Sequence, residues 1–404
     1  MERAFAVAHP GCTLRIGVLD YAATANRLVA QSATLSATNS TLRVGRVALT
    51  GVRLARLFFG RGALADSLAK AKVDATNLDV EFPQEHYVIH CARLQALVAA
   101  SELIAEGTEL RTLVEDEEFF ATHEYRTTRF HVIVPEYRMS GVAYGELLQG
   151  KAWRAKALDF SQRSFDALVN RDKPGEPLVK PPLMVHEALA AIRQPLQIDS
   201  LSITNRHATY RERVVAGAHP GVLTFSAVNI SVEGIANQGN GSAAIHLQAQ
   251  GDLMNAGVLK VQMSIPITPP DFSLHYSGSL SVMDLTRLDA FLDIAERTRI
   301  KSGRAQAAEF DIDVAAGRAS GRVRAIYRDL EIAVLDKQTD TSKGVRNRVA
   351  SFLTNTLKIR NSNAPETWRS MKQGKVNYSR RPEDEFIQFA WFALRTGVLD
   401  VISN

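Results

Sequence analysis

The chain has 404 residues, of which 46% are hydrophobic and 23% charged, a composition typical of a folded protein rather than a disordered one. It contains no run of about 18 consecutive apolar residues, so the sequence predicts no membrane-spanning helix. Two cysteines, Cys12 and Cys91, are too few for a disulfide scaffold or a four-cysteine zinc site. The net charge of +5 is much smaller than the basic excess typical of nucleic-acid-binding proteins, so we expect no nucleic-acid partner.

The N-terminal part of the chain, residues 1–172, contains a motif that recurs. A glycine-valine pair follows a predicted strand at Gly51-Val52 and again at Gly141-Val142, and Gly234-Ile235 is a third similar pair. Two alternative explanations fit this pattern: a structural repeat, or a coincidence, since glycine and leucine are common residues. Residues 93–114 are ambiguous, because their leucine and alanine content favours a helix whereas the repeat favours strands. We therefore interpret residues 1–172 as an N-terminal β-repeat region.

A segment rich in proline and glycine, residues 173–182, is the best internal boundary. Apolar spacing predicts a short helix over residues 183–192 after it. The expected organisation is a linker with a short helix at 173–194, a β-region at 195–340, and a basic helix with an aromatic tail at 341–404.

Residues 243–280 have the clearest pattern in the chain. Apolar and polar residues alternate over 243–253, 257–267 and 272–280, with short turns between these runs, and residues 222–232 are expected to precede them as a fourth strand. Strict alternation indicates strands with one apolar face, and the short turns indicate antiparallel neighbours. A change of period predicts a crossing helix over residues 283–297 with Asp284 as its N-cap, and strands are expected again at 310–314, 321–327 and 330–335.

The C-terminal part of the chain is strongly basic. Residues 341–381 contain ten Lys or Arg and one acidic residue, Glu366, and residues 343–359 have the apolar spacing of one amphipathic helix. A run of aromatic and aliphatic residues follows at 386–394. Such a segment suits an anionic membrane surface or an acidic partner, although the solvated face of a helix and a loop has the same composition.

No catalytic motif is present: the sequence has no GxGxxG, Walker-type GxxxxGK[ST], HExxH or GxSxG. His86, His90 and Cys91 lie close together in sequence, and two histidines four residues apart on a strand share a face, but a metal site needs at least three convergent ligands. Asp311 and Asp313 have the spacing of a carboxylate pair, which is also the ordinary pattern of a solvent-facing strand. We expect no enzyme activity, no cofactor and no metal site.

Several runs resemble the C-terminal region of AsmA-like envelope proteins over about residues 195–402. They are Pro220-Gly-Val-Leu-Thr-Phe225, Asp271-Phe-Ser, Gly278-Ser-Leu, Met283-Asp-Leu, Gly317-Arg-Ala-Ser-Gly321, Tyr327-Arg-Asp-Leu330 and Arg360-Asn-Ser-Asn-Ala-Pro365 with the aromatic tail. The resemblance implies a mainly β fold, an elongated repeating antiparallel β-groove with a few short crossing helices. It also implies a periplasmic protein held by an inner-membrane anchor in its full-length form, and we expect that anchor to be encoded before Met1.

The resemblance further implies a role in phospholipid transport or outer-membrane homeostasis, with phospholipid acyl chains on the apolar face of the groove. The predicted lipid-facing residues are Ile245, Leu247, Leu259, Val261, Met263, Phe272 and Leu274. The predicted docking residues for a membrane surface or an envelope membrane protein are Lys358, Arg360, Trp368, Phe386, Phe389 and Trp391.

Three alternatives stay open at this point. The apolar strand faces can pack together in an ordinary β-sandwich or barrel. The chain can be a periplasmic scaffold for outer-membrane assembly without lipid cargo. The aromatic tail can cap the last strands instead of docking.

Overall fold

The computed structural model describes residues 2, 11–52, 68–175, 177, 181–239, 243–267, 271–335, 359–365 and 371–403. The chain is mainly β, with 58% strand and 15% helix in one large, mostly antiparallel sheet and a few short helices, as the alternation predicts. It divides into two compact units. Unit 1 is Met1–Phe119, Arg129–Phe165 and Gln194–Thr204, and unit 2 is Phe120–Thr128, Asp166–Arg193 and Asn205–Asn404. The predicted linker 173–194 therefore lies almost wholly inside unit 2. No helix in the described ranges is long and apolar enough to cross a bilayer.

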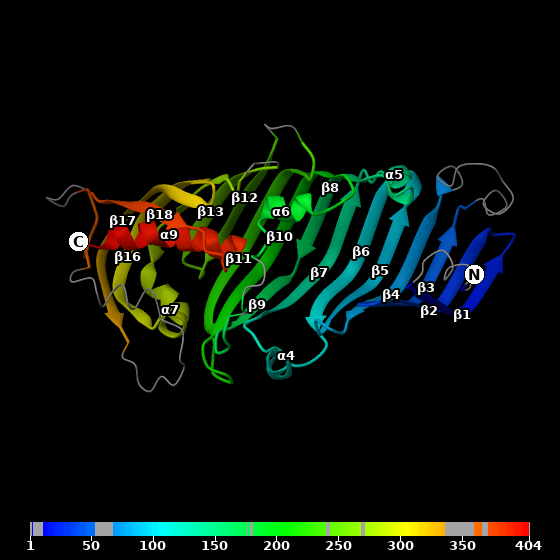
Figure 1. Ribbon diagram of the computed structural model, residues 1–404, viewed down its shortest axis with the longest axis horizontal. Helices are drawn as coiled ribbons and strands as arrows, with labels where there is room; N and C mark the ends of the chain where they lie inside the picture. The colour runs from blue at the N-terminus through cyan, green and yellow to red at the C-terminus, as the bar shows by residue number, and fades with distance from the viewer. Residues whose placement is uncertain are drawn as a thin grey trace. The chain divides into compact units, whose positions relative to one another are not determined.

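Unit 1 is a meander in which each strand pairs antiparallel with the next (Figure 1). Its strands are β1 (Thr13–Ala22), β2 (Arg27–Ser36), β3 (Thr41–Thr50), β4 (Lys72–Phe82), β5 (Tyr87–Leu97), β6 (Glu102–Thr112), β7 (Thr128–Ser140) and β8 (Trp153–Gln162). The short helical segments η1 (Val98–Ala100), α4 (Asp116–Thr122) and α5 (Tyr144–Leu148) lie between strands. The ambiguous residues 93–114 are therefore mostly strand, because pairing with neighbouring strands outweighs local helix propensity.

The recurring Gly-Val motif has the same local structure in its first two copies. Gly51 and Gly141 both follow a strand end with positive φ, 69° and 67°, and each precedes a buried valine, Val52 or Val142. Glycine suits this position because a left-handed backbone has no steric cost without a Cβ. Gly234 also has positive φ but lies inside β11, so the third copy differs.

One residue on each of strands β1 to β7 interrupts the ladder, and we call this line of residues the crease. It consists of Gly17, Ser32, Gly45, Asn77, Ala92, Gly107 and Pro135, which the register skips in every successive strand pair from β1–β2 to β6–β7. Ser32, Asn77 and Gly107 have positive φ, so alternate strands bend there. The apolar positions also switch between odd and even numbers at the crease. On β4, for example, the apolar residues are Val73 and Ala75 before it and Leu78 and Val80 after it.

The strands β9 (Ser164–Asn170) and β10 (Leu196–Arg213) contain points where the chain passes between units. Unit 2 continues with β11 (Gly221–Ala236), β12 (Ala244–Leu253), β13 (Gly257–Pro266), β14 (Leu274–Leu280), β15 (Met283–Asp284), β16 (Thr298–Ala315), β17 (Arg318–Val334) and β18 (Gln373–Ser379). These strands pair antiparallel in the order β11-β12-β13-β14-β16-β17-β18, and β15 also pairs with β16. The helices of unit 2 are α6 (Val185–Ala190), α7 (Asp289–Ala295) and α9 (Phe386–Ile402), with η2 (Leu285–Leu288) before α7.

The meander of residues 222–280 and the helix at 183–192 form as predicted, and two details differ. The helix expected over 283–297 is shorter: Met283 and Asp284 belong to β15, and the Asp284 side chain accepts a hydrogen bond from the Thr286 amide at the start of η2. The strands expected at 321–327 and 330–335 are one strand, β17, in which Asp329 adopts a positive φ of 55°. At this irregular point the Asp329 amide donates a 3.1 Å hydrogen bond to the Ser362 hydroxyl oxygen.

Candidate functional site

The predicted lipid-facing residues of unit 2 share one face of the sheet. Leu247 lies directly opposite Met263 on β13, and Met263 lies opposite Tyr276 on β14. Val261, two residues before Met263, lies on the same face because side chains on a strand alternate. Leu259 pairs with Leu280, Ile245 with Ile265 and Leu274 with Val314, all in this same set. The register therefore gives a continuous apolar face, while a contact with lipid stays a prediction.

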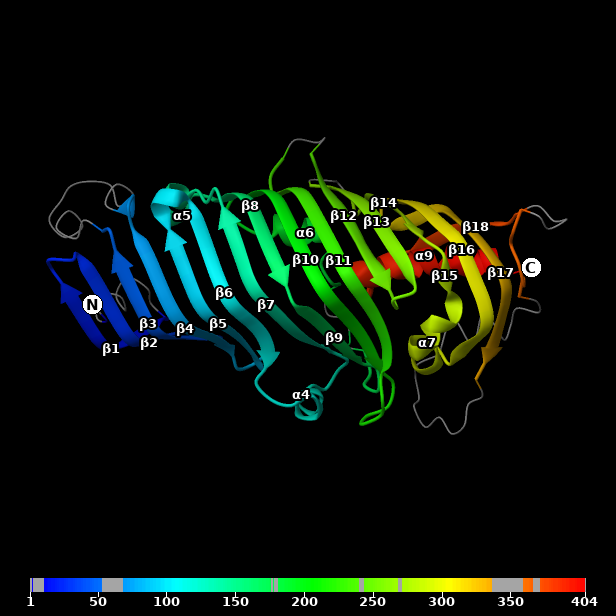
Figure 2. The ribbon, with the colours of Figure 1, turned by 180° about the vertical axis from the view of Figure 1, so that it is seen from behind.

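The C-terminal helix covers much of this face. Figure 1 shows α9 in front of β16–β18, and Figure 2 shows it behind the same strands, so the helix lies against one side of the sheet. Its Phe389, Ala393 and Val401 are fully buried in a cluster with Phe272, just before β14, and with Tyr276 on β14. The Tyr276 hydroxyl donates a 2.9 Å hydrogen bond to the Ala390 carbonyl, and burial raises the pKa of this phenol.

Helix α9 also touches the sheet backbone directly. A Cβ on Gly374 of β18 would overlap the carbonyl oxygen of Gly397 on α9. A Cβ on Gly397 would lie 2.5 Å from Cγ2 of Val323 and 2.7 Å from Cγ2 of Val376. The two glycines thus let helix and strand approach more closely than side chains would permit. Helix α6 covers a second part of the same face through Met184, Val185 and Leu189.

This cover divides the predicted lipid-facing set into two groups. Ile245, Phe272 and Leu274 are buried in the core beneath the helices, where the chain's own side chains occupy the space next to them. Met263 is partly buried and packs against that core. The three remaining residues are half-buried and stand outside this cluster: Leu247, Leu259 and Val261.

The apolar face of unit 1 follows both sides of the crease. One row of paired residues lies on one side and a second row lies on the other, each running over strands β3 to β7. The first row is Val47, Ala75, Leu94, Ala105 and Tyr137, and the second is Val44, Leu78, Cys91, Thr108 and Val134. Burial raises the pKa of the Tyr137 phenol, and the Cys91 thiol lies near enough to raise it further. Since Tyr137 belongs to the first row and Cys91 to the second, the two rows are close in space.

Cover over this unit 1 face is confined to its margins among the described residues. Tyr144 of α5 and Val142 pack on Ala96, Leu103 and Met139 at one set of strand ends. At the other end, the ring of Phe119 in α4 meets Tyr87 edge-on at 5.5 Å. Leu78, Leu94 and Tyr137, between these margins, are half-buried. No helix in the described ranges packs on this middle section.

The opposite face of unit 1 is polar and paired. Arg93 donates to Asp74 at 2.8 Å, and this bond holds the pKa of the Asp74 carboxyl below its ordinary value. His90 Nδ1 lies 2.8 Å from Asp79 Oδ1. His86 is in the turn before β5 with positive φ, and Cys91 belongs to the apolar face, so the sequence cluster of these residues does not converge on one site. This face is a solvated surface with ordinary ion pairs.

The predicted docking residues separate in the structure. Lys358, Trp368 and residues 343–358 of the expected basic helix lie outside the described residues, and Ile359 forms an isolated antiparallel bridge with Ser403. Arg360 is half-buried and donates to Asn363 Oδ1. Phe386 and Phe389 do share a helix face, but it is the face turned into the core, so Phe389 is not a surface contact. Trp391 is 49% exposed, and Ile387, which the sequence analysis missed, is 74% exposed one turn earlier. The burial of Phe389 agrees with the capping alternative.

Searches for related proteins found no protein-family model and no curated protein that matches the chain.

Proposed function

We propose that this chain is a non-enzymatic cell-envelope protein whose apolar sheet face binds phospholipid acyl chains and so contributes to phospholipid transport or outer-membrane homeostasis. Its setting in this proposal is the periplasm, with an inner-membrane anchor in the full-length protein. One observation carries the proposal: two mainly apolar rows of unit 1 run over five strands on both sides of the crease, with described cover only at the margins. Between those margins Leu78, Leu94 and Tyr137 of these rows are only half-buried.

A face of this kind favours acyl chains for a physical reason. Apolar surface gains about 25 cal/mol per Å² when it leaves water, so an uncovered apolar strip favours an apolar occupant. An acyl chain is narrow, flexible and non-polar, and it needs no hydrogen-bonding partners along its length. The crease supports this assignment, because the alternation shifts by one residue there and the rows on its two sides therefore lie on the same face of the sheet.

The test is photo-crosslinking in cells with two neighbouring residues of β5. A benzophenone amino acid at Leu94, on the apolar face, is expected to form adducts with phospholipid that mass spectrometry identifies. The same amino acid at Gln95, whose side chain bonds Asp74 on the polar face, is the matched control and is expected to give none. Equal lipid adducts at both positions, or none at either, contradict the proposal.

The second candidate is a periplasmic scaffold for outer-membrane assembly that holds no lipid. The observation that favours it is the closure of the unit 2 face by α6 and α9, since a chain that fills its own apolar face there has less need of a ligand. A protein adduct at Leu94 with no lipid adduct would support this candidate over the first.

A further inference from the structure

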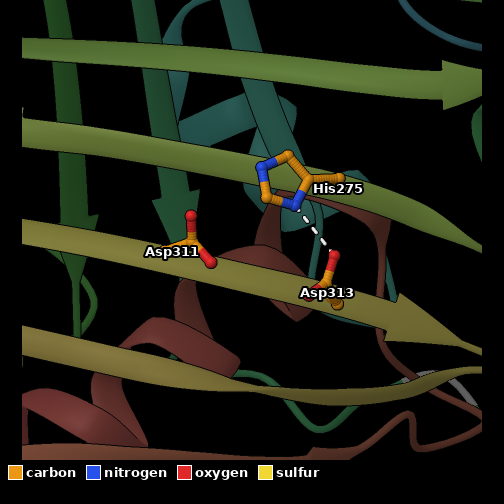
Figure 3. A group of neighbouring side chains, drawn as sticks. All are labelled: His275, Asp311 and Asp313. Atoms are coloured by element: carbon orange, nitrogen blue, oxygen red, sulfur yellow. Dashed lines mark hydrogen bonds and ion pairs between the residues drawn. The ribbon is translucent and has the colours of Figure 1, made fainter.

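A histidine joins the carboxylate pair of the sequence analysis on the polar face of unit 2. His275 on β14 lies directly opposite Asp313 on β16, and Asp311 is two residues earlier on β16 (Figure 3). Strand alternation explains the arrangement, because the intervening Ile312 and the flanking Leu274 point into the core and are buried. The backbone ladder therefore fixes the Cα positions of all three polar residues.

The donor atoms of these residues converge. One ligand atom from each of His275, Asp311 and Asp313 lies within 4.8 Å of the others, and no second such group exists among the residues that the structure describes. His275 Nδ1 is 2.8 Å from Asp313 Oδ1. The side chains of His275 and Asp313 are 44% and 72% exposed, so surrounding packing does not lock either of them into one rotamer.

The site has an open side. Asp311 also lines a shallow pocket of about 360 Å³ together with polar residues of β13, β14 and β17, including Gln262 and Ser277. Water or a small ligand can approach the group from this pocket and complete the coordination of a metal held by three protein donors. Arg322, the cross-strand neighbour of Asp311, adds a positive charge there, which weakens cation binding and favours an ion that forms strong bonds to its ligands.

We propose that His275, Asp311 and Asp313 form a binding site for a divalent transition metal, for which Zn²⁺ is the best match. One imidazole nitrogen and two carboxylate oxygens are ordinary zinc ligands, with bonds of about 2.0–2.2 Å. Imidazole is a poor ligand for Mg²⁺ and Ca²⁺, which take oxygen donors, so the set discriminates against those abundant ions. Three protein donors leave a coordination position for water, as in zinc sites that are open to a ligand.

The experiment is calorimetric titration of the full chain with Zn²⁺ alone, because the ten histidines require a comparison of variants rather than a single isotherm. His275→Ala and Asp313→Asn are each expected to weaken one saturable Zn²⁺ equivalent by at least about tenfold. The matched control is His246→Ala, an exposed histidine on the same polar face whose cross-strand partner, Ser264, pairs in turn with His275. It is expected to leave that equivalent unchanged, and Mg²⁺ is expected not to compete.

Because the three side chains are on the surface, circular dichroism of each variant is expected to match the parent chain. The proposal is overturned if the His275→Ala isotherm superimposes on that of the parent chain, which would leave His275 and Asp313 as an ion pair only. It is also overturned if His246→Ala loses the same equivalent, if Mg²⁺ displaces Zn²⁺ at equal concentration, or if no saturable binding occurs.

Discussion

The ring of Phe389 on α9 meets the ring of Phe272 edge-on, with centroids 5.1 Å apart and planes inclined at 70°. Phe389 also lies 5.7 Å from the ring of Tyr378. Aromatic pairs in this geometry add to the gain from burial alone. The contact fixes the C-terminal helix on the apolar face of unit 2.

Phe389→Ala is therefore expected to destabilise the protein by about 3–5 kcal/mol, since it leaves a cavity in a fully buried site. Chemical denaturation measures the change. The control is Ile387→Ala on the solvent side of the same helix, where 74% exposure predicts an effect within about 0.5 kcal/mol. Equal effects of the two substitutions would show that α9 is not anchored by this face.

Gly397→Ala tests the direct helix-strand approach. The added methyl group would overlap Val323 and Val376, so we expect a loss of about 1–3 kcal/mol from overpacking. Gly145→Ala in α5 is the matched control, because nothing lies within 4 Å of its Cβ position and alanine is the better helix former. Thermal denaturation is expected to show a lower midpoint for Gly397→Ala than for the parent chain. The midpoint of Gly145→Ala is expected not to decrease. A stabilised Gly397→Ala protein would contradict the close packing.

Much of unit 2 could be predicted from the sequence because one rule, alternation, governs it. The pairing of Leu247 with Met263 follows once three alternating runs are joined by short turns. The helix that covers this face could not be predicted in the same way. The pattern of Phe386, Phe389 and Ala390 defines an apolar helix face, but a sequence pattern does not name the surface against which that face packs.

Unit 1 was harder to interpret for a different reason. The crease shifts the alternation by one residue near the middle of each strand, so a run such as Val73 to Val80 matches neither a strand nor a helix throughout. The zinc site proposed at His275 was missed because its ligands are 36 and 38 residues apart in the chain, and only the strand register brings them together. Alternation along each strand does predict that these three side chains lie on the polar face. It does not predict how far His275 is from Asp311 and Asp313, because that distance depends on which strands are neighbours.

The ion pair between Asp74 and Arg93 predicts a pH dependence of stability. The hydrogen bond from Arg93 lowers the pKa of the folded carboxyl below its ordinary value of 3.8. A depressed folded pKa means that the contribution to stability is present above the unfolded pKa and is lost as pH falls through the folded one. Asp74→Asn is expected to be less stable than the parent chain at neutral pH, and the two are expected to converge in acid as the pH falls through the folded pKa.

Denaturant titrations over a series of pH values measure this difference. Arg93→Ala is the companion variant and is expected to show the same convergence, because it removes the other half of the pair. A difference between Asp74→Asn and the parent that stays constant into acid would contradict the assigned cause.

Leu247→Asp tests whether the half-buried part of the unit 2 face contacts lipid. A carboxylate on an acyl-binding surface costs several kcal/mol, so phospholipid that co-purifies with the chain is expected to fall in this variant. Gln248→Asp is the matched control, since the adjacent side chain is exposed on the polar face. Quantitative lipid mass spectrometry compares the two. If Leu247→Asp unfolds the protein by circular dichroism, the residue belongs to ordinary core and the lipid assignment for unit 2 fails.

The last prediction concerns membrane docking through the outer side of α9. Deleting residues 382–404 would remove Phe389 and expose the core beneath it, so a truncation confuses docking with unfolding. Ile387 and Trp391 avoid this difficulty, because they lie one helical turn apart and are exposed. Arg395, one further turn along α9, lies over the ring of Phe392 and places a positive charge near this surface. Exposed aromatic and aliphatic side chains beside basic residues favour the interfacial layer of an anionic membrane.

The double substitution Ile387→Ser with Trp391→Ser is therefore expected to reduce flotation with anionic vesicles while the denaturation midpoint stays within experimental error. Arg43→Ser with Lys301→Ser removes two exposed cations elsewhere and is the control for non-specific charge attraction. If both double variants float as well as the parent chain, α9 serves only as the cap of the sheet.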